Sequence, residues 1–296
     1  MAPASTETTA PETTTTAAAA YDIKTILAGI KADPALTAML PAANQSNGVK
    51  VASDIPYMPW EGFVGETSQP TGFDYDLSQA LGAKLGVKFD FIKVQFDSII
   101  IGIQAGKYDI FMSGMYDNAE RQKVFDLVDY AEDTTGIITL KGNPKNLKNL
   151  DSLAGLTVGC EKGTTQALLL DKLNKQSQSA GKPAMTVKQF PGQADALLAL
   201  QGGQIACDVT DRSTAKYNAE TTKEGTELVF ELVIDPAAPD GYDPAPDGIG
   251  VLKSNTGLRD AIQKGLQALI DDGTYKTICD QWGFLPVASA QINQGK

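Results

Sequence analysis

Histidine is absent from the 296-residue chain, and its absence excludes whole classes of chemistry. Without it the chain offers neither Ser-His nor Cys-His catalysis, nor a histidine-ligated metal site. Cysteine is scarce, and Cys160, Cys207 and Cys279 are spaced too widely for a zinc pattern. In an exported chain Cys160 and Cys207 would be able to form a disulfide. Three buried, apolar thiols are the alternative, and the sequence leaves both open.

Basic charge and long apolar runs are lacking as well. The formal net charge is −11, which argues against nucleic acid or an anionic membrane as the main partner, because phosphate binding needs a basic face. No apolar run reaches the ~18 residues of a transmembrane helix. Hydrophobic residues make up 42% of the chain, enough for a buried core, and its length favours about two domains.

The N-terminal segment is unlike the rest of the chain. Residues 1–20 are rich in Thr, Ala and Pro and nearly free of large apolar side chains, which predicts a disordered tether. They lack the charged and apolar regions of a signal peptide. The segment is either an ordinary flexible terminus or a spacer that follows a removed signal or a lipidated cysteine. Residues 21–48 predict a helical extension that is broken near Pro34.

From residue 49 onward, strand and helix patterns alternate. The apolar spacing predicts strands at 49–52, 88–94 and 108–112 and helices at 73–85 and 97–105. The pattern restarts with strands at 153–160, 185–190 and 205–210 and helices at 164–173 and 194–200. The Pro- and Gly-rich residues 235–248 predict a loop, and helices near 257–271 and 274–281 end the chain. This order predicts two α/β units with mainly parallel sheets and helices on both faces.

A polar stretch, SGMYDNAERQ, follows the strand predicted at 108–112. Ligands of α/β sheets bind outside the carboxyl ends of strands, so this stretch is a candidate site. A lone arginine is by default a solvated side chain, but the planar fork of Arg121 also suits a carboxylate. Ser113 and Gly114 allow close approach to the backbone, and a helix starting near Asn118 would add free N–H groups. Together these features favour an anion site.

Two further strand ends carry similar polar groups. In EKGTTQ, residues 161–166, the turn through Gly163 opens a helix whose N–H groups and hydroxyls suit an anion, although a simple N-cap is the alternative. Asp211 follows the strand predicted at 205–210 and is either an N-cap or an acceptor for an ammonium group.

The loop SDIPYMPW after the first strand combines one acid with aromatic side chains and two prolines. Asp54, Tyr57 and Trp60 therefore predict a rigid aromatic wall with one charge, which Phe96 would face. The alternative is that these rings pack in the core or within the loop.

Taken in order, these stretches resemble the extracellular solute-binding proteins of ABC importers for polar amino acids, solute-binding family 3. The resemblance covers nearly everything from Val49 to Gly283. Its most specific motifs are VKVASDIPYMPW, GFDYDL, QAGKYDI, LDSLAGLTVGCEKGTTQ and LIDDGTYKTICDQWG.

The resemblance implies an α/β, two-lobe periplasmic-binding-protein fold of type II. Each lobe would be a mainly parallel sheet flanked by helices, and two crossing strands would form the hinge. We expect one lobe from residues 49–135 with 247–288 and the other from 136–246. The implied protein is a monomer, not an enzyme, without cofactor or metal. It would be exported, periplasmic or extracellular, tethered as a lipoprotein, and would deliver a polar amino acid to a membrane ABC permease.

The resemblance also assigns the ligand contacts. It places the α-carboxylate of an amino acid on Arg121, Ser113 and Thr165, and the α-ammonium on Asp211. Tyr57, Phe96 and Asp54 would contact the ligand's side chain. The full set of expected ligand-binding residues is Asp54, Tyr57, Trp60, Phe96, Ser113, Gly114, Tyr116, Arg121, Glu161, Thr165, Gln166 and Asp211.

This chain departs from the family pattern at several positions of the expected site. Tyr116 replaces a usual Ser or Thr, Asn118 a usual Thr, and Glu161 an apolar residue, while Ala206 stands where an Asp is usual and Asp208 follows it. The acidic additions favour a cationic side chain, such as that of Arg, Lys or ornithine, because a buried carboxylate needs a partner. Glutamine or glutamate is the runner-up ligand.

An enzymatic alternative rests on the same resemblance, because dehydratases of prephenate-like substrates are built on this scaffold. Glu161 would then be a general acid with a raised pKa. No paired acid or base accompanies it in the sequence, so we favour a binding protein.

Overall fold

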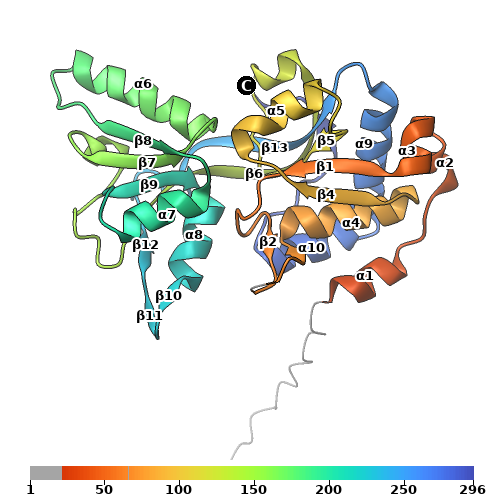
Figure 1. Cartoon of the computed structure of the whole chain (residues 1–296), viewed down its shortest axis with the longest axis horizontal. Helices are drawn as coiled ribbons and strands as arrows, with labels where there is room; N and C mark the ends of the chain where they lie inside the picture. Colours follow the sequence, from red (N-terminus) through yellow and green to blue (C-terminus); the bar gives the residue numbers. More distant parts are fainter. Residues whose placement is uncertain (1–21, 66) are drawn as a thin grey trace, which may run out of the picture.

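The computed structural model describes residues 22–65 and 67–296, so the tether predicted for residues 1–20 lies outside the described part. One sheet runs through the whole molecule in the order β4-β1-β5-β13-β6-β9-β7-β8. Figure 1 shows its two halves as separate lobes, joined where β6 and β13 cross between them.

The first lobe is built on three parallel strands, β1 (Val49–Ser53), β4 (Phe89–Lys93) and β5 (Ile110–Phe111). Successive residues of a strand face opposite sides of the sheet, so each face has its own core. On one face Val51 and Ile110 pack against α4 (Phe73–Leu85), α9 (Thr256–Asp271) and α10 (Thr274–Trp282). On the other face Ala52 and Phe111 pack against α5 (Phe96–Gln104).

The second lobe repeats this plan with the parallel strands β7 (Thr157–Glu161), β8 (Thr186–Phe190) and β9 (Cys207–Asp211). Its helices are α6 (Thr165–Ser179), α7 (Gln193–Gln201) and α8 (Arg212–Thr221). Shorter elements are η2 (Leu150–Leu153), β10 (Lys223–Glu224), β11 (Glu227–Leu228) and β12 (Phe230–Leu232). Cys160 and Cys207 are buried free thiols in the core of this lobe, and Cys279 is a buried free thiol in the first, so the packing alternative holds for all three.

The strands β6 (Phe125–Leu140) and β13 (Tyr242–Leu252) are antiparallel and connect the lobes. The loop predicted at 235–248 is therefore wrong in its second half, because the chain is already a strand from Tyr242. The register between the two strands shifts between Tyr242 and Ala245 and again between Asp247 and Gly248. These irregularities accommodate the prolines, which lack a donor for the ladder.

Several predicted helix ends move. Pro34 begins α2 (Pro34–Thr37) rather than ending a helix, because proline is tolerated at the first helical position and Asp33 caps it. It lies between α1 (Ile23–Gly29) and α3 (Ala42–Asn47). The α5 helix begins at Phe96, one residue before the start predicted at residue 97. Near Asn118 the structure has only the 3-10 turn η1 (Arg121–Lys123).

The remaining short strands join the first lobe. They are the hairpin β2 (Gly62–Phe63) and β3 (Pro70–Thr71), and β14 (Gln291–Ile292), which pairs with β6. The residue boundaries predicted for the two lobes, 49–135 with 247–288 and 136–246, stay a prediction. The crossing strands contribute to the cores of both lobes, with Val128 and Ile249 in a core of the first lobe and Ile137 in a core of the second.

Candidate functional site

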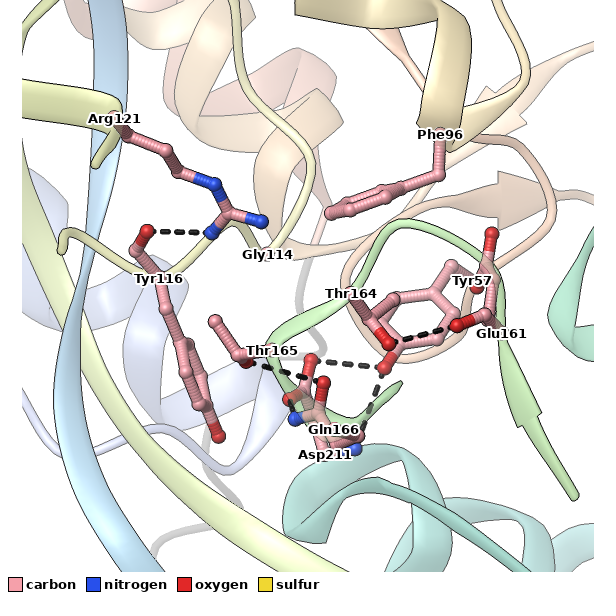
Figure 2. A pocket seen from close by; sticks show the side chains of 10 residues that line it. All are labelled: Tyr57, Phe96, Gly114, Tyr116, Arg121, Glu161, Thr164, Thr165, Gln166 and Asp211. Carbon is pink, nitrogen blue, oxygen red and sulfur yellow. Dashed lines mark hydrogen bonds between the residues drawn. The ribbon is translucent and has the colours of Figure 1, made fainter. Parts of the chain in front are cut away.

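A small cavity lies between the lobes, at the carboxyl ends of β1, β5, β7 and β9. Figure 2 shows side chains of both lobes converging on it. Its lining residues are Tyr57, Phe96, Gly114, Tyr116, Arg121, Glu161, Thr164, Thr165, Gln166 and Asp211. Of these only Thr164 was not predicted. Of the predicted contacts, Asp54, Trp60 and Ser113 do not line the cavity.

Trp60 lies in the core of the first lobe, where its side chain is fully buried. Its ring packs against Phe73 and Phe284, with centroids 5.9 and 4.4 Å away. It forms the floor beneath Gly114, where an added Cβ would lie 2.8 Å from the indole. Gly114 also has a φ of +48°, so glycine is required there on two counts. In this structure Trp60 supports the site without reaching it.

Ser113 likewise turns away from the cavity, in contrast to its expected contact with a carboxylate. Its hydroxyl donates to the buried Glu61 carboxyl at 2.6 Å and accepts from the Asp54 backbone N–H at 2.9 Å. The Gly114 N–H donates to Asp74 at 3.0 Å. Burial raises the pKa of Glu61 well above its ordinary value and that of Asp74 to about 7. This buried acid pair fixes the backbone of the loop that carries Arg121.

Arg121 provides the positive charge of the cavity. Its side chain is 8% exposed, and Nη1 donates to the Tyr116 carbonyl at 2.6 Å. The guanidinium lies over the Phe96 ring at 5.7 Å. Burial lowers its pKa to about 10, so it remains charged at neutral pH. The free helical N–H groups predicted beside it are not found, because the Asn118 side chain accepts the Arg121 N–H at 2.9 Å.

The second lobe contributes the turn that opens α6. Thr164 is the N-cap, accepting from the Ala167 N–H at 3.3 Å and donating to the Glu161 carbonyl at 2.8 Å. This cap presents Thr165 and Gln166 to the cavity, opposite Arg121 (Figure 2). Thr164 could have been predicted from the sequence as the N-cap of α6. The turn that it caps lies at the cavity, so Thr164 lines the cavity as well.

Asp211 ends β9, and its carboxylate makes no capping bond to α8. Instead it accepts from the Tyr57 hydroxyl at 2.8 Å and from Gln166 Nε2 at 2.6 Å (Figure 2). Tyr57 belongs to the first lobe, so this contact joins the lobes across the cavity. Burial raises the pKa of Asp211 to about 8. A cation bound beside it would restore the charged form.

A second contact between the lobes is a carboxyl pair. Asp54 follows β1 and Glu161 ends β7, and their carboxyl groups lie close enough for each to shift the pKa of the other. Glu161 is only 3% exposed. Burial raises its pKa well above the ordinary range, and the adjacent Asp54 carboxylate adds to the effect. Burial raises the pKa of Asp54 to about 6. The pair therefore holds its protons to higher pH than two isolated carboxyl groups would.

Two more buried carboxyl groups near Arg121 and Asp211 were missed. Asp247 on β13 is fully buried, and neither of its oxygens has a hydrogen-bond partner among the described residues. Asp133 on β6 accepts from the Ser213 N–H at 3.2 Å, and burial raises its pKa to about 6. Both sit on the crossing strands, which the sequence did not reveal at these positions.

The site as a whole carries more negative than positive groups. Arg121 stands against the carboxyls of Asp211, Glu161 and Asp54, with Asp247 behind it. Such a site can hold a ligand with one anionic group and more than one cationic group. Among residues 22–65 and 67–296, no cluster of acidic or cysteine side chains is arranged to hold a metal ion.

Two α/β lobes, two crossing strands and a polar cavity at the facing strand ends define a ligand-binding protein of the type II periplasmic class. The family model for bacterial extracellular solute-binding proteins, family 3, matches residues 49–285, and the chain belongs to this family. The predicted family and fold are thus confirmed.

Named relatives agree with this class. The arginine-binding protein ArgT of Corynebacterium glutamicum is 29% identical over 254 residues, covering 84% of this chain and 79% of that protein. An ancestral arginine-binding protein has been solved bound to arginine, with a TM-score of 0.70, 31% identity and coverage of 79% and 97%. A structure of an ancestral arginine-binding protein bound to glutamine has a TM-score of 0.69 and 31% identity. The match covers 79% of this chain and 96% of that one.

A further solved structure is an ancestral amino acid-binding protein, AncCDT-1, described as a precursor of cyclohexadienyl dehydratase. Its TM-score is 0.68 at 28% identity, covering 79% of this chain and 94% of that one. The family of this chain is one of transporter solute-binding proteins rather than enzymes.

Proposed function

We propose that this protein captures a basic amino acid, such as arginine, lysine or ornithine, in the cavity between its lobes. The observation that carries the proposal is the charge of the cavity. One buried arginine faces the carboxyls of Asp211 and Glu161, and the carboxyl of Asp54 lies beside that of Glu161.

A zwitterionic head group uses two of these charges. Its carboxylate pairs with the guanidinium of Arg121, whose planar fork suits a carboxylate, and Thr165 lies opposite it. Its ammonium pairs with Asp211, whose oxygens already accept from Tyr57 and Gln166 and can accept again. The Asp54–Glu161 pair then remains without a counter-charge, and a cationic side chain supplies it.

Capture by closure follows from the placement of these groups. Arg121, Tyr57 and Phe96 belong to the first lobe, whereas Thr165 and Asp211 belong to the second. Only a closed arrangement lets one ligand touch both sets, so ligand binding favours closure. The closed protein then delivers its ligand to a membrane ABC permease.

The cellular setting is part of the proposal. The family is extracellular or periplasmic, and we propose that this chain acts there as a monomer, tethered through its N-terminal segment as a lipoprotein. Within residues 22–65 and 67–296, no helix has both the length and the apolar character needed to cross a membrane.

A neutral ligand is the alternative for the same transport role. The ancestral arginine-binding protein was solved with glutamine as well as arginine, which supports glutamine as the runner-up. Glutamate fits less well, because its side chain would meet the Asp54–Glu161 pair. Its binding is therefore expected to be the weakest of the three.

An enzymatic role has one observation in its favour, the raised pKa of Glu161 together with a neighbour described as a dehydratase precursor. We propose that the chain is nevertheless not an enzyme, because its family is one of transporter solute-binding proteins. The Asp54–Glu161 pair does not decide the question, since paired carboxyl groups also occur in catalytic sites. Absence of turnover with prephenate and arogenate would agree. Turnover that is lost in Glu161→Gln would overturn the proposal.

The test is a thermal-shift screen of protein that has been unfolded, dialysed and refolded to remove any bound ligand. A ligand that binds only the native state stabilises it by about 4 kcal/mol at a thousand times its Kd. We expect large shifts with arginine, lysine or ornithine, and smaller shifts with citrulline, glutamine and glutamate. A largest shift with glutamate, or none with any α-amino acid, would contradict the proposal.

A further inference from the structure

The last residues of the chain lie beyond the range 49–285 that the family model matches, yet they reach the loop that carries Arg121. We define the C-terminal strap as residues 291–295 and the Arg121 loop as residues 113–122. Figure 1 marks the C-terminus close to α5, beside the space between the lobes. The C-terminal strap is therefore far from the Arg121 loop in sequence but close to it in space.

The strap is anchored on the crossing strand β6. Ile292 pairs with Val128 in an antiparallel ladder. Asn293 then exchanges two bonds with Leu127, one from its own N–H at 3.0 Å and one to its Oδ1 at 2.8 Å. These bonds fix the direction in which the strap leaves the sheet.

Beyond this anchor, Gly295 closes directly on the Arg121 loop. Its N–H donates to Asp117 Oδ2 at 2.7 Å, and its carbonyl accepts from Gln122 Nε2 at 2.8 Å. Asp117 and Gln122 are also bonded to each other, at 2.9 Å. The fit leaves no room for a side chain, because a Cβ on Gly295 would lie 2.0 Å from the Asp117 carbonyl oxygen. Gly295 thus holds the loop on both sides of Arg121.

A second contact of the strap supports the same region. The Gln294 N–H donates to Asp129 Oδ2 at 3.0 Å, and burial together with the nearby Asp117 carboxyl raises the pKa of Asp129 to about 7. Both carboxyls are at least nine-tenths buried. The strap N–H groups therefore add donors to two buried acids, of which Asp117 also accepts from Gln122, whereas Asp129 Oδ1 has no hydrogen-bond partner among the described residues.

The Arg121 loop has little regular structure of its own. It contains only the start of the 3-10 turn η1, and it supplies Gly114, Tyr116 and Arg121 to the cavity. A loop without a ladder or a full helix depends on outside contacts for its shape. The strap is one of these contacts, and the Asp117 N–H bond to Pro246 at 2.7 Å is another.

We propose that the C-terminal strap is a positioning element for Arg121, holding its guanidinium where a ligand carboxylate is captured. The proposal rests on the proposed function for the identity of that carboxylate. The strap touches no ligand and acts only through the loop. Loosening the strap should therefore lower the affinity for ligands that carry a carboxylate. The residues that the second lobe contributes to the site should be unaffected.

The test compares Gly295→Val with the wild-type full-length chain. The added side chain must displace the strap from Asp117. Lys296→Ala is the matched control, because Lys296 is the neighbouring residue and is exposed. Binding of L-arginine and of agmatine, which has the same side chain without the carboxylate, is measured by calorimetry. Hydrogen exchange of residues 113–122 and 161–166 is measured without ligand.

We expect Gly295→Val to lower the affinity for arginine by about tenfold or more and the affinity for agmatine by less than about twofold. Hydrogen exchange should become faster in residues 113–122 but not in residues 161–166. Unchanged arginine affinity would overturn the proposal, and so would an equal loss for both ligands, which indicates a general structural defect. If the wild type binds no arginine, the proposed function fails. Exchange alone then decides, with faster exchange confined to 113–122 supporting the strap and unchanged exchange refuting it.

Discussion

The sharpest prediction concerns Glu161→Gln, which replaces the carboxyl group at the end of β7 by an amide of nearly the same shape. A cationic side chain in the cavity would lie against Glu161 and Asp54. At about 4 Å and an effective dielectric constant of about 20, one such ion pair is worth about 4 kcal/mol. Part of this is spent on releasing the proton that Glu161 holds in the unliganded protein, because burial raises its pKa.

The net loss of arginine affinity in Glu161→Gln is therefore expected to be about 2 to 3 kcal/mol, or about 30- to 150-fold in Kd. L-Glutamine has no charge at that position, so its affinity should change by less than about threefold. Asp97→Asn is the matched control variant. It removes a carboxylate that does not line the cavity but pairs with Lys162 of the second lobe at 2.9 Å, so any effect of Asp97→Asn through closure should be equal for arginine and glutamine.

The pH dependence gives a second readout of the same variant. The cation favours the charged form of Glu161, so the unliganded protein binds more protons than the complex. Arginine affinity should then rise with pH, by at most tenfold per unit for the Glu161 proton, and Asp211, whose pKa burial raises to about 8, adds a second proton that remains in Glu161→Gln. Calorimetry in buffers of different ionisation enthalpy measures the proton released. An equal loss for both ligands, or an unchanged pH slope in Glu161→Gln, would refute the reasoning.

Three further predictions follow from the buried charges. Arg121→Ala should reduce the binding free energy of arginine by about 3–5 kcal/mol and leave the protein folded. Unchanged affinity, measured by calorimetry, would show that Arg121 is not part of the site. Asp211→Asn should abolish the ion pair with the α-ammonium, while the free energy of unfolding of the unliganded variant, measured in urea, stays within about 1 kcal/mol of the wild type. A variant that unfolds without ligand would mark Asp211 as structural. The unliganded protein should be more stable to urea at pH 5.5 than at pH 7.5. Asp74 and Asp129 keep their protons to about pH 7 when folded but ionise near 4 when unfolded, so stability is present at low pH and lost as pH rises; a rise in stability would contradict this.

The sequence predicts the order of strands and helices well, because apolar periodicity is a local signal. It also predicts which polar residues gather, since the carboxyl ends of neighbouring parallel strands meet at one edge of a sheet. Arg121, Glu161 and Asp211 were found in this way. Glu161 and Asp211 are the last residues of β7 and β9, Arg121 lies on the loop after β5, and together they line one cavity.

What the sequence could not give depends on distant contacts. The sequence of an aromatic loop is the same whether its rings face a ligand or the core. Trp60 faces the core because it packs against Phe284, at the far end of the chain. Asp247 was hidden by its Pro- and Gly-rich surroundings, because the strand β13 depends on its pairing with β6 and β5. The fit of Gly295 against Asp117 leaves no local pattern at all.

The most direct test of the central claim compares L-arginine with L-citrulline by calorimetry at pH 7.5 on the ligand-free wild-type protein. The two amino acids share a head group and a length, but citrulline carries a neutral urea group in place of the guanidinium. If the Asp54–Glu161 pair recognises a cationic side chain, arginine should bind about a hundredfold more tightly, since a desolvated ion pair contributes about 3 kcal/mol or more. Equal affinities, or tighter binding of citrulline, would contradict the account.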